Sequence, residues 1–191
     1  MNHKRLLSSL TLAVIGMQPL GAAVAAEASS VSDMFTGGSA STAFRYRYES
    51  VDQDGIDKQA NASTLKSRLT WTSATYKDFK TVLEFDNVTV IGGENYKTPT
   101  NGKAGYPIVA DPKGTDVNQA YIHHQSSDLS ATLGRQRILH GGQRFVGGVG
   151  WRQNEQTFDA LRLTLPDVNS VKIDYSYIWN VNRIFGPKDS A

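Results

Sequence analysis

The chain has 191 residues, a length typical of one domain, and carries 20 Lys and Arg against 18 Asp and Glu. It has no cysteine, which excludes disulfides and a lipid-modified cysteine. The formal charge of +2 is close to balance, so any electrostatic function depends on where charges lie, and no nucleic-acid partner is expected.

Residues 1–25 are predicted to be a secretory signal peptide. Lys4 and Arg5 precede an apolar stretch at 6–15, and the small residues Ala23 and Ala25 fit a cleavage site. The apolar stretch is too short to span a bilayer as a helix. Removing Lys4 and Arg5 would leave 18 positive against 18 negative residues. Residues 26–38 then form a short N-terminal lead.

Alternation of apolar and polar residues dominates the rest of the chain and predicts β-strands. In the first strand, Phe44 and Tyr46 lie on one face, and Arg45 and Arg47 lie on the other. In chain order, the seven predicted strands are 39–49, 65–72, 79–86, 117–124, 129–138, 157–165 and 171–182.

The predicted connections alternate in length along the chain. Three short ones lie at 72–78, 125–128 and 166–170, and three long ones lie at 50–64, 92–116 and 139–156. Outer-membrane barrels combine short periplasmic turns with long external loops. Residues 39–191 are therefore predicted to be all-β, forming part of an up-and-down antiparallel transmembrane β-barrel.

The alternation also predicts which side chains face lipid and which face the lumen. Trp71 and Phe79 near one strand end, and Tyr177 and Trp179 near the other, are typical of aromatic girdles at membrane interfaces. The alternative is that these aromatics form the core of a β-sandwich. The residues expected to face lipid are Leu69, Trp71, Leu83, Phe85, Leu161, Leu163, Ile173 and Tyr175, and those expected to face the lumen are Arg45, Arg47, Lys66, Arg68 and Glu84.

Residues 134–161, "GRQRILHGGQRFVGGVGWRQNEQTFDAL", combine glycines with arginines. Strand parity would aim Arg135 and Arg137 at lipid. Either the strand has left the hydrocarbon by residue 135, or a bulge near Gly134 turns both inward. The glycines allow a long loop to fold into the barrel, where arginines would attract anions. The alternative is a solvated external loop whose arginines pair with Glu155 and Asp159.

Catalytic and metal-binding patterns are weak in this sequence. No nucleophile, base and orienting group stand out together. The adjacent His123 and His124 face opposite sides of a strand, so they cannot bind one metal together. The chain is expected to be no enzyme and to hold no cofactor or metal. Two alternatives to a channel stay open: a soluble periplasmic carbohydrate-binding β-sandwich, and an outer-membrane barrel enzyme with serine, histidine and acidic groups at its outer rim.

Three segments carry a resemblance to a known family: "VNQAYI" at 117–122, "LGRQRI" at 133–138 and "QRFVGGVGWRQNEQTFDALRL" at 143–163. Together they resemble the alginate-export family of outer-membrane porins. The resemblance implies a monomeric barrel in the outer membrane of a Gram-negative bacterium, surrounded by lipid, with an electropositive lumen for anionic solutes or anionic polysaccharide. With those implied by the resemblance, the candidate pore-lining residues are Arg45, Arg47, Lys66, Arg68, Arg135, Arg137, Arg144, Arg152 and Arg162.

The chain is short for such a barrel. Seven strands after residue 25 correspond to about 24 residues per strand, and about 16–18 strands at that rate need roughly 380–430 residues. The chain is therefore expected to be the N-terminal half of a larger barrel. Because the first and seventh strands would both run outward, the 191-residue chain alone is not expected to form a working pore.

Overall fold

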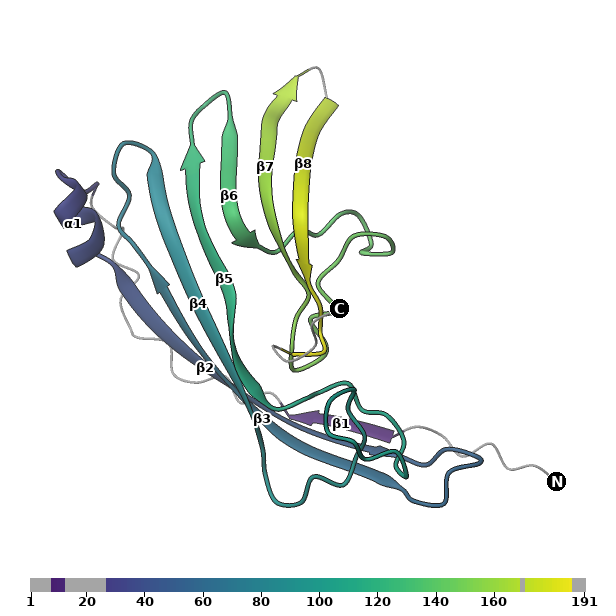
Figure 1. Cartoon of the computed structure of the whole chain (residues 1–191). Coiled ribbons are helices and arrows are strands. Elements are labelled where there is room, and N and C mark those ends of the chain that lie inside the picture. The colour runs from purple at the N-terminus through teal and green to yellow at the C-terminus, as the bar shows by residue number, and fades with distance from the viewer. Residues whose placement is uncertain (1–7, 13–26, 169–170, 187–191) are drawn as a thin grey trace.

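The computed structural model describes residues 8–12, 27–168 and 171–186, in which one antiparallel sheet and one short helix make up the regular structure. The strands pair in chain order without a crossover, from β1 to β8 (Figure 1). The predicted all-β up-and-down fold is confirmed. The strands are β1 (Ser8–Leu12), β2 (Ser39–Val51), β3 (Ala60–Thr72), β4 (Phe79–Val90), β5 (Gly114–Gln125), β6 (Ser130–Gln136), β7 (Thr157–Val168) and β8 (Val171–Asn182).

The seven long strands β2–β8 correspond one by one to the seven predicted strands. The short β1 pairs with β2 and lies inside the predicted signal peptide, most of which is outside the described residues. The signal peptide therefore stays a prediction. The predicted turn at 166–170 is shorter in the structure, because β7 continues to Val168 and β8 begins at Val171; residues 169–170 lie outside the described part.

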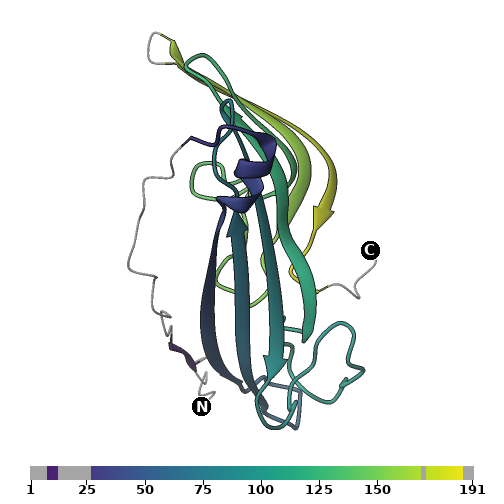
Figure 2. The same ribbon diagram turned by 90° about the vertical axis from the view of Figure 1, so that its left-hand side faces the viewer.

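The sheet is strongly curved and open. Figure 1 shows the helix and the β3–β4 and β5–β6 turns at one end of the strands, and the β2–β3 and β4–β5 connections at the other. Seen from the convex side in Figure 2, the β6–β7 connection lies behind the front strands, on the concave side. We call the concave surface the inner face and the convex surface the outer face.

The outer face is apolar over most of its length. Leu69, Phe85, Ile173 and Tyr175, all predicted to face lipid, are exposed, whereas Trp71, Leu83, Leu161 and Leu163 are partly covered. The exposed apolar side chains that share the outward strand parity are Phe44, Tyr48, Leu69, Phe79, Phe85, Ile122, Leu133, Leu165, Val171, Ile173, Tyr175 and Tyr177.

The first long connection is shorter than predicted. It covers 52–59 rather than 50–64, because β3 already begins at Ala60 and pairs with Val51 of β2. Ala60 and Ala62 carry little β-signal in the sequence. They are buried by Tyr96 and Val109 of the β4–β5 connection, which packs over this end of β3. Long-range packing therefore extends the strand beyond its local pattern.

Of the two explanations that the sequence left open for Arg135 and Arg137, the structure excludes the bulge near Gly134. The β6 register with both neighbours runs without a shift through Gly134, and β6 ends two residues later at Gln136. Gly134 is instead required because its φ is +121° and an added Cβ would lie 2.3 Å from the Ala120 carbonyl oxygen. Arg135 stays on the outward parity, opposite Asp159 of β7, so the outer face becomes polar at this level.

Helix α1 (Val31–Thr36) was not predicted. Ser30 caps its N-terminus by accepting a hydrogen bond from the Asp33 N–H, and Met34 is its buried residue. Phe35 stacks on Trp71 with ring centroids 5.8 Å apart, and Gly38 leaves room for the Trp71 indole. The helix therefore covers one end of β3. Among the described residues, no helix is long and apolar enough to cross a membrane.

Two small apolar cores lie between the sheet and its long connections. One joins Val51, Ala60 and Ala62 to Tyr96 and Val109. The other joins Phe158 and Ala160 of β7 to Ile138, with Val146 packed against them. Each core fixes one long connection to the inner face, and the polar side chains of that face lie between them.

Candidate functional site

Charged side chains from the central strands form the floor of the site. The period of two along β2, β3 and β4 brings Arg47, Lys66, Glu84 and Asp86 to the inner face. All four are buried; only 6% of Lys66 is exposed, because the β6–β7 connection, residues 137–156, lies across them. Charges this deeply buried require partners.

Gln153 attaches the β6–β7 connection to strands β2 and β3. Its side-chain oxygen accepts a hydrogen bond from Arg45 Nε at 2.9 Å, and its amide nitrogen donates to Thr64 Oγ1 at 2.9 Å and to the Thr64 carbonyl at 3.1 Å. The Gln153 backbone N–H donates to Asp111 of the β4–β5 connection at 2.8 Å. One fully buried residue therefore joins two strands to the β4–β5 and β6–β7 connections.

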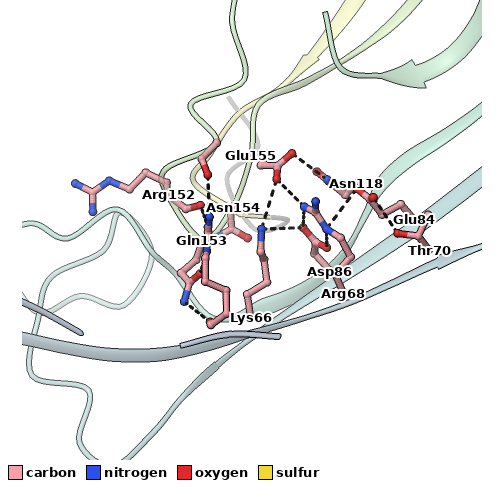
Figure 3. A network of polar contacts seen from close by, with 12 residues as sticks. Lys66, Arg68, Thr70, Glu84, Asp86, Asn118, Arg152, Gln153, Asn154 and Glu155 are labelled. Atoms are coloured by element: carbon pink, nitrogen blue, oxygen red, sulfur yellow. Dashed lines mark hydrogen bonds and ion pairs between the residues drawn. The ribbon is translucent and has the colours of Figure 1, made fainter. Parts of the chain in front are cut away.

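Glu155 is the second attachment point, and three cations share its carboxylate. Figure 3 shows two of the contacts, which measure 2.7 Å to Arg68 Nη2 and 3.4 Å to Lys66 Nζ. The third is 2.5 Å to Arg137 Nε. Burial by itself raises the pKa of Glu155, but the Arg137 hydrogen bond and the nearby cations outweigh it and hold the pKa well below its ordinary value. Glu155 is therefore a fixed negative charge. We call Gln153 and Glu155 the latch.

Arg68 and Arg137 each have a carboxylate partner besides Glu155. Arg68 makes a two-pronged contact with Asp86, at 2.7 and 2.6 Å. Arg137 contacts Glu84 at 2.5 Å, and Asn118 donates to the same Glu84 oxygen at 2.7 Å. Arg68 and Asp86 both belong to strands and stay paired without the connection, whereas Arg137 belongs to the connection and joins it to Glu84.

A second charge cluster lies beside the latch. The Arg47 guanidinium bonds Glu49 at 2.6 Å and lies 3.2 Å from Asp111, and Arg152 bonds Glu49 at 2.9 Å. Both guanidinium groups stack on Trp151, at 5.2 and 4.2 Å from its ring centroid. Burial raises the pKa of Asp111 even though Gln153 and both arginines favour its charged form.

The two clusters together are almost neutral. Six cations face five carboxylates, which leaves a formal charge of +1. The cations of these two clusters are therefore largely neutralised by neighbouring carboxylates. The cations are Arg45, Arg47, Lys66, Arg68, Arg137 and Arg152, and the carboxylates are Glu49, Glu84, Asp86, Asp111 and Glu155.

Three predicted site residues lie outside this group. Arg135 pairs with Asp159 at 2.8 Å on the outward parity. Arg162 faces inward near the short turns and pairs with Asp174 of β8. It lines a hollow of about 430 Å³ with His123 and Lys172. Arg144 is exposed at the tip of the β6–β7 connection.

The sequence did not single out Gln153, Asp111 or Asn118. Gln153 lies in the segment 143–163 that carries the family resemblance, but no role was assigned to it, and Asp111 stands in "ADPKG", which fits neither a strand pattern nor a known site motif. Their roles arise only when residues 42 positions apart meet over the sheet. Among the described residues, no group of acidic and histidine side chains is arranged to hold a metal ion.

Comparison with known proteins gave one match. A family model described as "Alginate export" matches residues 38–178, which include β2 to β7, most of β8 and the whole latch. No curated protein and no solved structure matches the chain.

Proposed function

Because the chain belongs to the alginate export family, a family of outer-membrane transport proteins, we propose that its sheet forms part of the wall of an outer-membrane channel that passes anionic solutes or anionic polysaccharide. The observation that carries the proposal is the division between the faces. Charged side chains are gathered on the inner face, and apolar side chains are exposed over the outer face. Such a division suits lipid on one side and water on the other.

The open sheet bears on how the wall is completed. In the described part, β8 pairs only with β7, so its other edge is free to pair. Unpaired backbone groups in lipid cost several kcal/mol each. We propose that further strands close the wall at this edge. The predicted monomeric state belongs to that closed form.

The preference for anions rests on cations along the inner face. Near the short turns, Lys80, Arg162 and Lys172 line two adjoining hollows, in which Arg162 pairs with Asp174. Farther from the short turns, the charge cluster around Glu155 and the one around Glu49 and Asp111 together carry a formal charge of +1. A surplus of positive charge in a confined passage raises the local concentration of anions.

The two alternatives have less support. A carbohydrate-binding β-sandwich needs a second sheet, and the described residues form one sheet. A barrel enzyme needs a histidine beside a nucleophile and a carboxylate. In the part of the chain that the structure describes, His123 contacts Thr132, His124 packs on Phe79, and neither makes an ion pair with a carboxylate.

The test is membrane fractionation followed by reconstitution. The protein, expressed from its genomic coding region, is expected in the outer-membrane fraction and, in planar bilayers with a KCl gradient, should give a reversal potential of the anion-selective sign. Recovery in the soluble periplasmic fraction would overturn the channel. A cation-selective reversal potential would overturn the anion preference alone.

A further inference from the structure

Helix α1 stands on the outer face of the sheet, at the end that carries the β3–β4 and β5–β6 turns. Figure 1 shows it beyond the convex side, and Figure 2, which views that side, shows it in front of the strands. Phe35 stacks on Trp71, whose strand parity points outward, with the two ring planes 2° apart. A channel wall does not require a helix on its lipid side, so this position has another cause.

Backbone and side-chain contacts fix α1 to the β3–β4 turn. The Ala74 N–H donates to the Met34 carbonyl at 2.9 Å, and the Ala28 N–H donates to the Thr75 carbonyl at 2.7 Å. The Met34 side chain is buried, and Ala74 lies so near Gly37 that an added Cβ would be 3.4 Å from its own. The helix is therefore held at one level of the sheet.

The helix has one apolar side and one polar side. At about 100° per residue, Val31, Met34 and Phe35 share a sector of roughly 100°. Met34 is buried by the protein, whereas Val31 is 57% exposed and Phe35 is 51% exposed. About half of each of these two side chains is therefore left uncovered. The residues on the remaining sides of the helix are Ser32, Asp33 and Thr36.

The level of α1 is one border of the apolar band of the outer face. At the other border, the Tyr46 hydroxyl lies 3.0 Å from the Ser63 hydroxyl. Trp71 and Ser63 are eight residues apart on β3. This spacing corresponds to about 20 Å along the membrane normal at the usual strand tilt, close to the apolar band of about 25 Å in outer-membrane barrels. Trp71 and the Phe35 ring stacked on it therefore lie where aromatic rings meet a membrane–water interface.

We propose that α1 is an interfacial anchor, in which Val31 and Phe35 insert into the phospholipid at the short-turn end and fix the depth of the sheet in the bilayer. Residues 27–38 contain Glu27 and Asp33 but no lysine or arginine. The binding therefore comes from burial of apolar surface and not from attraction to anionic headgroups. The inference goes beyond the proposed channel, and it rests on that proposal only in requiring lipid at the outer face.

The size of the exposed side favours lipid over a second protein. Six helical residues are about 9 Å long. A stable protein interface buries roughly 800 Å² on each partner, far more than two half-exposed side chains offer. A bilayer that already surrounds the outer face needs no such area, because the helix is carried into it with the sheet.

The test is electron paramagnetic resonance of nitroxide labels in the protein expressed from its genomic coding region and reconstituted into vesicles of phosphatidylethanolamine and phosphatidylglycerol. The 191 residues contain no cysteine, so Val31→Cys, Thr36→Cys and Leu69→Cys each add one labelling site to them. The measured quantity is the ratio of relaxation by oxygen, which concentrates in lipid, to relaxation by a water-soluble nickel chelate. The ratio at Val31 should be several-fold higher than at Thr36 and lower than at Leu69, an exposed residue inside the apolar band.

Two further measurements test the cause of the insertion. Adding Phe35→Ser should lower the Val31 ratio several-fold, whereas the matched Thr36→Ser should leave it unchanged; equal ratios in these two variants would overturn the anchor. Replacing phosphatidylglycerol by neutral phosphatidylcholine should not change the Val31 ratio. A fall in neutral lipid would overturn insertion by apolar burial.

The outcomes also separate the anchor from the channel. A Val31 ratio as low as that at Thr36 would place the helix in water and overturn the inference alone. Protection of Val31 from both reagents would mean that another copy of the protein covers it, which also overturns the lipid contact. A low ratio at Leu69 would mean that the outer face is not in lipid, and it would overturn the proposed function together with the anchor.

Discussion

Replacing Glu155 by Gln tests whether the latch holds the β6–β7 connection on the wall. The substitution keeps the shape of the side chain and removes the charge that Arg68, Arg137 and Lys66 share at 2.7, 2.5 and 3.4 Å. All of these groups are largely withdrawn from water. While the connection stays on the sheet, water therefore cannot solvate the cations in place of the lost ion pairs.

The size of the effect follows from the partners that remain. Removing one partner of a buried ion pair costs about 3–5 kcal/mol when the other charge is left alone. Here Arg68 keeps Asp86 at 2.6 Å and Arg137 keeps Glu84 at 2.5 Å, and glutamine still offers an acceptor oxygen. We therefore expect a loss of about 2 kcal/mol in the free energy that holds the connection closed, which is roughly a 30-fold rise in the detached population.

The assay is hydrogen–deuterium exchange of residues 137–156 in detergent, with reversal potentials in planar bilayers as a second measurement. Glu155→Gln should exchange roughly 30-fold faster in this segment and should be more anion-selective, because six cations then face four carboxylates. The control is Glu94→Gln, whose 3.0 Å partner Lys113 is mostly exposed, so little change is expected. Unchanged exchange in Glu155→Gln would refute the latch.

Three further predictions follow from the same geometry. Gln153→Ala removes the hydrogen bonds to Arg45 and Thr64 and leaves buried polar groups unpaired, which should cost about 3 kcal/mol of local stability. We expect faster proteolysis at 141–150, and cleavage at the wild-type rate would contradict this. Since the pKa of Glu155 lies below its ordinary 4.5, its stabilisation is present above about pH 4.5 and is lost as the pH falls further. The ratio of exchange rates at 137–156 between Glu155→Gln and the wild type should therefore be the same at pH 5 and pH 7, and a ratio that falls between pH 7 and pH 5 would contradict it. Spin labels at Leu83 and Glu84 should show opposite accessibility to a lipid-phase quencher; equal accessibility would mean that the register is wrong.

The strands were predictable because each residue has one of two environments. In β8, the predicted bounds 171–182 match the structure, since Ile173, Tyr175 and Tyr177 alternate with the polar Lys172, Asp174 and Ser176 over its first half. Where the second environment is a covering loop rather than water, the pattern fades. The beginning of β3 was therefore missed, because its alanines are buried by residues about 35–50 positions away.

The site was only half predictable, and the reason is physical. Parity along a strand tells which face Lys66 or Arg68 points to, but it does not tell which carboxylate will lie opposite. The sequence left two interpretations of the glycine–arginine stretch open, an arginine-lined passage and a loop whose arginines pair with Glu155 and Asp159. Both pairings occur, and Arg137 meets Glu155 on the inner face rather than outside it.

This pairing changes what the cations of the inner face mean for transport. Asp111 and Glu155, which neutralise much of the latch clusters, come from the two long connections and not from strands. Arg137 and Arg152 belong to the β6–β7 connection as well. If both connections moved off the sheet, four strand cations would face the three strand carboxylates Glu49, Glu84 and Asp86, and the formal charge of the sheet would stay at +1. Arg45 would then lose its bond to Gln153, and Lys66 and Arg68 would lose Glu155. The position of the connections therefore decides which strand cations are open to an anion and not the sum of their charge, so that opening of the passage and exposure of its cations are one event.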